Sequence, residues 1–150
     1  MKLSKTVLDA LFEKAGKTMQ NSYSPYSKFK VGAAVLTKNG HIYGGTNIEN
    51  ASYGATLCAE RNAIFAAICN GEKEFDALVI VFKQKDLGPL STPCGACRQV
   101  MSEFCSPEMP IYTADLSTGK PQRVVKKKLK DYIPYPFSPA ALLKKPAKKK

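Results

Sequence analysis

The chain has 150 residues, of which 44% are hydrophobic and 23% charged, and its formal net charge is +11. This composition is ordinary for a globular protein that buries a real core, and the length predicts one domain. No uncharged apolar stretch approaches the length of a membrane span, and no apolar run near the N-terminus is long enough for a signal peptide. We therefore expect a cytoplasmic protein with no membrane partner.

The first predicted element is a scaffold helix over residues 5–20, where apolar residues recur at steps of three and four. The Asn39-Gly40 dipeptide then predicts a hairpin, with strands over residues 29–36 and 42–47. Residues 57–70 predict a second helix, and apolar residues all round it indicate that it is buried.

In the second half of the chain, residues 77–82 form a continuous apolar run, as expected of a central strand covered on both faces. Pro93 can begin a third helix. Its inner face would consist of the following residues: Cys97, Val100, Met101, Phe104 and Cys105. Another strand is predicted at residues 111–113, and the alternation of strands with helices indicates an α/β layered domain.

Positive charge is concentrated near the C-terminus. Residues 1–122 contain 13 Lys and Arg against 11 Asp and Glu, whereas residues 123–150 contain 10 against 1. Prolines alternate with these lysines, so we expect the last dozen residues to form a frayed, solvated extension. We interpret the basic Lys/Pro-rich tail, residues 138–150, as solubilising, and a specific nucleic-acid arm is the alternative.

Two cysteine-containing segments indicate chemistry. Cys58-Ala59-Glu60 lies at the start of the second predicted helix, and Cys94 and Cys97 lie at the start of the third. The positive end of a helix favours thiolate, so both N-termini suit metal ligands. A structural zinc site uses four protein ligands, whereas a catalytic site usually offers three and leaves one position to water or substrate. Three thiols and one carboxylate therefore predict a hydrolytic centre with one Zn²⁺ per chain.

A fourth ligand elsewhere in the sequence is not expected. On one helix Cys69 would lie roughly 16 Å from Cys58, and Cys105 would lie about 12 Å from Cys97, which one zinc ion cannot span. Both spare cysteines are expected to be buried as small hydrophobes. The single histidine, His41, lies beside the Asn39-Gly40 turn and is interpreted as a surface residue rather than a ligand.

Charged residues beside the cysteines have expected roles of their own. Glu60 is predicted to carry protons between water and a substrate, and the alternative is a carboxylate that complements the helix dipole. If Thr56 caps the helix, Glu60 falls one place beyond the capping-box position, which weakens that alternative. Three thiolates leave the centre with a negative charge, which Arg61 or Arg98 could offset by donating to sulfur. Arg61 is preferred, because an ordinary surface position is the stronger alternative for Arg98.

These residues resemble the small cytidine deaminase family. The resemblance rests on residues 58–61 and 93–100, is supported by residues 26–34 and 47–54, and extends from roughly the first helix to Phe137. It implies a three-layer α/β/α sandwich around a mixed, roughly five-stranded sheet, with residues 1–137 as a single catalytic domain. It also implies zinc-dependent hydrolysis of cytidine and deoxycytidine to uridine and deoxyuridine, with release of ammonia, in pyrimidine salvage.

The resemblance further implies substrate contacts. Phe29 would stack on the pyrimidine, Asn47 and Glu49 would hold the sugar hydroxyls, and Ala59 would bind the base through its backbone. An aromatic face suits a base, and an amide with a carboxylate suits a polyol. The alternatives are a core position for Phe29 and a polar loop for Asn47 and Glu49.

Members of this family are typically homotetramers in which neighbouring chains complete each pocket, which would recruit Tyr53 and Phe137 across an interface. Residues 132–137 depart somewhat from the usual family ending.

Three other functions remain open at this point. A deaminase of a cytosine nucleoside antibiotic would share the metal motif and differ on the sugar side, although Asn47 and Glu49 favour the nucleoside. A nucleic-acid-binding module with a purely structural zinc would use the basic tail, but three ligands and a buried Glu60 argue against it. A polynucleotide deaminase needs a track of positive charge that a body of +2 hardly provides.

Overall fold

The computed structural model describes residues 3–83 and 92–138. The elements are α1 (Lys5–Met19), β1 (Val31–Thr37), β2 (Ile42–Thr46), the short 3-10 helix η1 (Tyr53–Ala55), α2 (Ala59–Cys69), β3 (Phe75–Phe82), α3 (Gly95–Phe104), β4 (Pro110–Asp115), β5 (Gln122–Lys128) and α4 (Leu129–Tyr132). The strands and helices expected from the sequence are present, with boundaries shifted by no more than two residues. None of the helices in the described ranges combines the length and apolar character needed to cross a bilayer.

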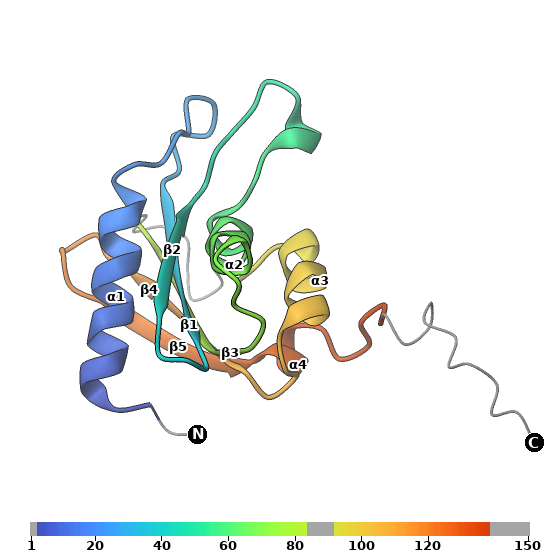
Figure 1. Cartoon of the computed structure of the whole chain (residues 1–150). Helices are drawn as coiled ribbons and strands as arrows, with labels where there is room; N and C mark the ends of the chain where they lie inside the picture. Colours follow the sequence, from blue (N-terminus) through green and yellow to red (C-terminus); the bar gives the residue numbers. More distant parts are fainter. Residues whose placement is uncertain (1–2, 84–91, 139–150) are drawn as a thin grey trace, which may run out of the picture.

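The five strands form one mixed sheet in the order β2-β1-β3-β4-β5. β3 and β4 are parallel, and the other neighbouring pairs are antiparallel. α1 packs on one face of the sheet, and α2 and α3 lie on the other (Figure 1). The fold is therefore the expected three-layer α/β/α sandwich around a mixed five-stranded sheet.

The spacing of apolar residues explains the two hydrophobic cores, one on each face of the sheet. α1 buries Leu11, Phe12, Ala15 and Met19 against the sheet, a stripe with helical spacing. β3 is buried almost throughout because it lies between β1 and β4 with helices on both faces. Its residues alternate between the core under α1 and the core under α2 and α3.

Glycines on strands β1 and β2 allow helices α1 and α2 to approach the sheet closely. A Cβ at Gly45 of β2 would lie 2.2 Å from the backbone nitrogen of Ala63 and 2.4 Å from the carbonyl oxygen of Ala59, both in α2. A Cβ at Gly32 of β1 would lie 2.1 Å from the carbonyl oxygen of Ala15 in α1. Glycine at position 45 therefore fixes how deeply the N-terminus of α2 lies in the fold, and two candidate site residues, Cys58 and Glu60, lie there.

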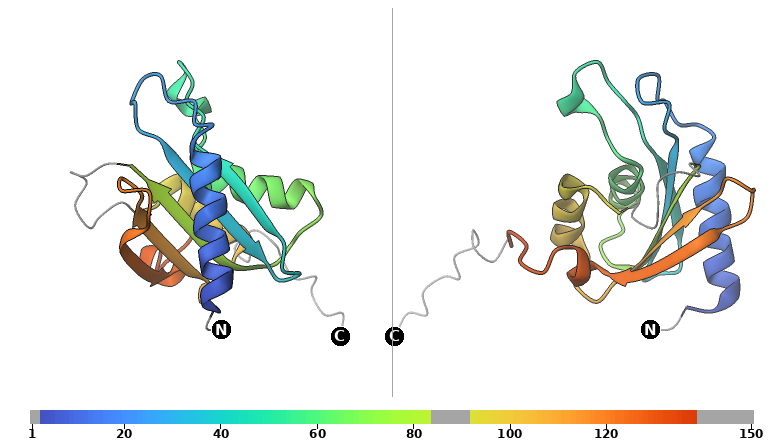
Figure 2. Two further views of the ribbon diagram at one scale, coloured as in Figure 1. Left: turned by 90° about the vertical axis from the view of Figure 1, so that its left-hand side faces the viewer. Right: turned by 180° about the vertical axis from the view of Figure 1, so that it is seen from behind.

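β5 was not expected as a separate element. It pairs with β4 and forms an edge of the sheet, as the view from behind shows (Figure 2, right). Lys126 lies over the ring of Tyr112, and Glu108 binds both Lys128 and Lys130, with N–O distances of 2.7 and 2.6 Å. Part of the basic C-terminal charge therefore belongs to the folded domain. The predicted tail, residues 138–150, lies outside the described residues except for its first position.

Three local expectations are wrong. Cys69 is exposed rather than buried, because it is the last residue of α2. Phe104 is 39% exposed, although Cys97 and Met101 of the same helix and its C-cap residue Cys105 are buried as expected. Cys58, and not Thr56, caps α2, so Glu60 is the second residue of the helix and still does not occupy the capping-box position.

Candidate active site

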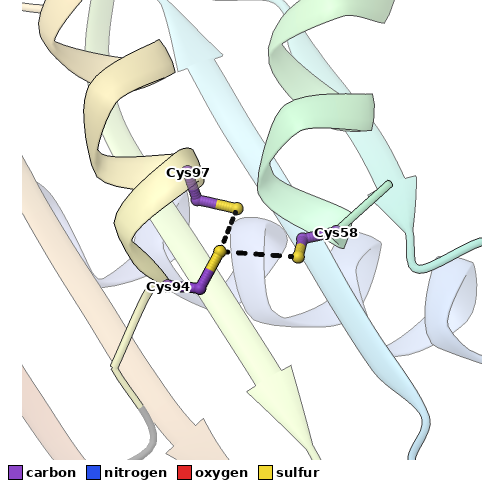
Figure 3. A group of neighbouring side chains, drawn as sticks. All are labelled: Cys58, Cys94 and Cys97. Atoms are coloured by element: carbon purple, nitrogen blue, oxygen red, sulfur yellow. Dashed lines mark hydrogen bonds between the residues drawn. The ribbon is translucent and has the colours of Figure 1, made fainter. Parts of the chain in front are cut away.

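The three predicted thiols converge between the N-termini of α2 and α3. Cys58 caps α2, Cys94 caps α3, and Cys97 lies in the first turn of α3, so that their sulfur atoms point toward one another (Figure 3). The Sγ atom of Cys94 lies 3.8 Å from that of Cys58 and 3.4 Å from that of Cys97. All three sulfur atoms lie within 4.8 Å of one another.

This geometry fits zinc. Tetrahedral ligands at about 2.3 Å from the metal lie roughly 3.8 Å apart, which is close to the observed separations. Across residues 3–83 and 92–138, no other group of three or more His, Cys, Asp or Glu side chains is arranged to hold a metal. His41 lies exposed beside the turn, as expected, and contacts Glu72, with 2.6 Å between Nδ1 and Oε1. The sulfur set therefore provides three ligands, as in a catalytic zinc site.

The electrostatics of the cluster favour thiolate at Cys58. The pKa of Cys58 is lowered to about 5, first by a hydrogen bond from the Cys97 thiol and further by Arg61 and Cys94. The pKa of Cys97 is raised, because its proton is held by Cys58 and because it is buried. One Nη atom of Arg61 lies 3.8 Å from the Cys58 sulfur and 3.0 Å from the carbonyl oxygen of Thr56.

The guanidinium of Arg61 lies where it can donate a hydrogen bond to a negatively charged sulfur atom of Cys58. Its Nε is buried and has no hydrogen-bond partner among the described residues. Such a donor is costly to bury unless a strong acceptor lies nearby, and thiolate is a stronger acceptor than thiol. The Nη atom of Arg61 beside the Cys58 sulfur is a second observation, besides the sulfur distances, that fits a metal-thiolate centre.

Glu60 is buried next to the sulfur cluster. Only 5% of the residue is exposed, and the pKa of its carboxyl group is raised to about 7, chiefly by burial and also by Cys58, whereas Arg61 and Cys97 act to lower it. A carboxyl group with a pKa near neutrality can both accept and donate a proton under physiological conditions. The sequence-based expectation of a buried carboxylate at this position is confirmed.

A cavity of about 260 Å³ opens beside these groups. Seven of its lining residues were predicted from the sequence: Phe29, Asn47, Glu49, Cys58, Ala59, Glu60 and Cys94. Six others were missed: Ser27, Val31, Thr56, Ile80, Phe82 and Thr92. The alternation of side chains along β3 places Ile80 and Phe82 on one face, but only the fold shows that this face reaches the cavity. Phe82 also contacts the predicted Phe29, with ring centroids 6.2 Å apart.

Asn47 and Glu49 shape the loop that carries Phe29. The side-chain oxygen Oδ1 of Asn47 accepts hydrogen bonds from the Ser22 hydroxyl at 2.6 Å and from the backbone nitrogen of Val31 at 2.9 Å. The Asn47 amide donates to the carbonyl oxygen of Phe29 at 2.8 Å.

The Glu49 carboxylate accepts hydrogen bonds from the backbone nitrogens of Tyr26 and Ser27, at 2.9 and 3.2 Å, and from the Ser27 hydroxyl. The Ser27 hydroxyl is the largest cause that lowers the pKa of Glu49. Glu49 therefore stays ionised and holds the turn before Phe29 in place.

Two of the predicted substrate-binding residues do not reach this cavity within one chain. Tyr53, in η1, is 81% exposed, and Phe137, near the end of the described chain, is 62% exposed. Neither lines the cavity.

The α/β/α sandwich and a three-sulfur centre with a buried carboxylate define a zinc-dependent hydrolase of the deaminase class. Residues 5–113 match the model of the "Cytidine and deoxycytidylate deaminase zinc-binding region", and the chain belongs to this family.

Similar proteins cover most of the chain. It is 46% identical to a cytidine deaminase of Sporosarcina psychrophila over 122 residues, which is 81% of this chain and 88% of the relative. It is 43% identical to a probable cytidine deaminase of Dictyostelium discoideum over 113 residues, 75% of this chain and 76% of that protein. The crystal structure of a cytidine deaminase from Burkholderia pseudomallei superposes with a TM-score of 0.77 at 39% identity, covering 90% of this chain and 100% of that one.

Proposed function

We propose that this chain is a zinc-dependent cytidine deaminase that hydrolyses cytidine and deoxycytidine to uridine and deoxyuridine and releases ammonia. The single observation that carries the proposal is the buried Glu60 beside the three convergent sulfurs, at the wall of a cavity. The similarity to cytidine deaminases over most of the chain supports the same substrate class.

The residues of the site divide the chemistry among them. Cys58, Cys94 and Cys97 would hold a zinc ion, which would supply the Lewis acidity that makes water a nucleophile near neutral pH. Glu60 accepts one proton from the attacking water and passes it to the ring nitrogen of the pyrimidine. It then takes the second proton, from the hydroxyl group that the water has become, and delivers it to the departing amino group. The water oxygen becomes the new carbonyl oxygen of the product, and the amino group leaves as ammonia.

Arg61 offsets the negative charge that three thiolates bring to the site. By donating to the Cys58 sulfur, it withdraws electron density from that ligand and preserves the electron demand of the metal. Without this donor the site would activate water less effectively, so we assign Arg61 to tuning the metal rather than to binding substrate.

The other side of the cavity would bind the nucleoside. Phe29 offers its ring to the pyrimidine, and Ala59 offers its backbone to the base. The Asn47 amide has one N–H left after its bond to Phe29, and the Glu49 carboxylate has acceptor capacity left after three bonds. Both groups can therefore bind sugar hydroxyls without giving up the loop that they organise.

We also propose that the protein is a cytoplasmic homotetramer of pyrimidine salvage. The exposed aromatic residues Tyr53 and Phe137 support the assembly, because each is free to enter the site of a neighbouring chain. Nucleic acid is not a proposed partner, since the basic residues nearest the described C-terminal end are partly neutralised by Glu108.

An ultraviolet absorbance assay tests the function. The purified protein should contain about one zinc per chain and convert cytidine and deoxycytidine, which absorb differently from their products. Cytidine monophosphate, free cytosine and nucleoside antibiotics serve as comparison substrates, and preference for an antibiotic would favour that sibling activity. A zinc-replete protein without activity on either nucleoside would contradict the proposal.

A further inference from the structure

Arg98 lies next to the metal ligand Cys97 but does not direct its donors at the sulfur atoms. Its Nε donates to the carbonyl oxygen of Pro93 at 2.7 Å. Its two terminal nitrogens donate to the carbonyl oxygen of Tyr132 at 3.1 Å and to Oγ1 of Thr92 at 2.9 Å. All three nitrogens of the guanidinium are therefore engaged, and each partner lies outside the sulfur cluster.

The partners of Arg98 belong to two segments that are far apart in the sequence. Thr92 and Pro93 form, with Cys94, the metal loop (residues 92–94), which leads directly into the ligand that caps α3. Tyr132 belongs to the C-terminal segment (residues 129–138). The Tyr132 ring also lies under the guanidinium, 5.5 Å from its carbon to the ring centroid, which adds a cation–π contact.

The metal loop depends on such a contact because, among residues 3–83 and 92–138, it has few other hydrogen bonds. Cys94 caps α3 without a side-chain hydrogen bond to the helix, since its sulfur is directed at the metal site. Pro93 has no N–H with which to anchor the backbone. The hydrogen bonds from Arg98 to both residues before Cys94 thus fix the direction from which this ligand enters the site.

We propose that Arg98 is a positioning residue that fastens the metal loop to the C-terminal segment and thereby holds Cys94 in its ligating position. The inference rests on the proposed zinc site and assigns this arginine a role separate from that of Arg61. Groups that orient metal ligands typically change metal affinity or activity 10- to 100-fold when removed. Loss of Arg98 should therefore leave the fold intact and weaken the binding of zinc.

The neighbouring residue provides a matched control. Gln99 also binds the C-terminal segment, since its Nε2 donates to the carbonyl oxygen of Phe137 at 2.8 Å, but it has no bond to the metal loop. If loosening the C-terminal segment alone released zinc, Gln99→Ala would act like an Arg98 variant. If the bonds to the metal loop are responsible, the two variants differ.

The test measures the rate at which zinc passes from the full-length protein to an excess of a coloured chelator. Arg98→Met should release zinc at least about tenfold faster than wild type, and Thr92→Val, which loses one acceptor, should release it faster by a smaller factor. Gln99→Ala and Tyr132→Phe should match wild type, because the latter keeps both the carbonyl and the ring. The cobalt-substituted proteins should show an altered ligand-field spectrum only for the first two variants.

Thermal unfolding of the zinc-free proteins distinguishes loss of Cys94 positioning from loss of overall stability. If only positioning is lost, the unfolding midpoints of Arg98→Met and Gln99→Ala should be similar. Equal rates of zinc release in wild type, Arg98→Met and Thr92→Val would overturn the inference alone. Equally fast release from Gln99→Ala and Arg98→Met would also overturn it. A wild-type protein that binds no zinc would overturn the proposed function as well.

Discussion

The two sides of the cavity are built in different ways. On the metal side, Cys58, Cys94 and Cys97 lie at helix N-termini, where helix geometry sets their direction over a few residues. On the nucleoside side, Asn47 and Glu49 are placed by bonds to residues 16 to 25 positions earlier in the chain. The difference teaches that each ligand-bearing segment of the metal side is local in the sequence, although the fold brings the two segments together, whereas each binding residue is itself held by contacts distant in the sequence.

The largest expected effect comes from removing proton transfer on the metal side of the cavity while zinc stays bound. Glu60→Gln keeps the size and burial of the side chain but removes its ability to take a proton from water. We expect turnover of cytidine to fall by about 10²- to 10⁴-fold, the range for loss of a general acid–base group, while zinc content stays near one per chain. Steady-state kinetics and metal analysis of the same preparation provide the check. Turnover near the wild-type value would remove Glu60 from the reaction.

A smaller loss is expected when charge compensation is removed. Arg61→Gln takes a positive charge from the side of the Cys58 sulfur, so turnover should fall by about 10- to 100-fold with a smaller change in KM. Arg61→Lys retains the charge but loses the planar fork, and its turnover should be intermediate. Kinetics over a range of cytidine concentrations separate the two parameters. A change confined to KM would show instead that Arg61 acts in substrate binding.

The nucleoside side should respond in KM rather than in turnover. Ser22→Ala removes the hydroxyl that donates to Asn47 at 2.6 Å, outside the cavity lining. Loss of one hydrogen bond of about 1 kcal/mol corresponds to roughly a fivefold change, so KM for cytidine should rise by about that factor with turnover little changed. Ser102→Ala, on α3, is a control that removes a hydroxyl whose hydrogen bond, within the described part of the chain, is to the carbonyl oxygen of Gln99. Equal KM values for wild type and Ser22→Ala would contradict long-range placement of Asn47.

The smallest expected effect concerns the edge strand, far from both sides of the cavity in sequence. Lys128 and Lys130 lower the pKa of Glu108 to about 2 from its ordinary value of 4.5. A lowered pKa in the folded state means stability that is present above pH 4.5 and is lost as the pH falls toward 2. Wild type should therefore exceed Glu108→Gln slightly in free energy of unfolding at pH 6, and the difference should shrink in acid. Denaturant unfolding across this pH range would detect it, and a constant difference would contradict the ion pairs.

The sequence allowed the metal side to be predicted because each of its signals is short. Cys58 with Glu60, and Cys94 with Cys97, carry the chemistry within a few positions, and the helix starts follow from nearby residues. The same approach missed Thr92 and Phe82, because no local pattern shows that the end of β3 and the metal loop meet at one cavity.

Strand β5 was not predicted, and Phe104 was wrongly predicted to be buried, because both are more exposed than the sequence pattern indicates. β5 is an edge strand whose residues are exposed on both faces except at Val125, so it lacks the alternation of apolar and polar residues that marks a half-buried strand. From the sequence, the lysines of β5 were therefore interpreted as part of the positively charged C-terminal region and not as a strand. Phe104 has the spacing of a core residue, but it is the last residue of α3 and stays 39% exposed.

X-ray absorption at the zinc edge of the purified protein tests the central claim most directly. We predict three sulfur neighbours at about 2.3 Å and one lighter neighbour, oxygen or nitrogen, at about 2.0 Å, with the lighter neighbour altered when a transition-state analogue is added. Four protein ligands that are unaffected by the analogue would describe a closed structural site and would contradict the account.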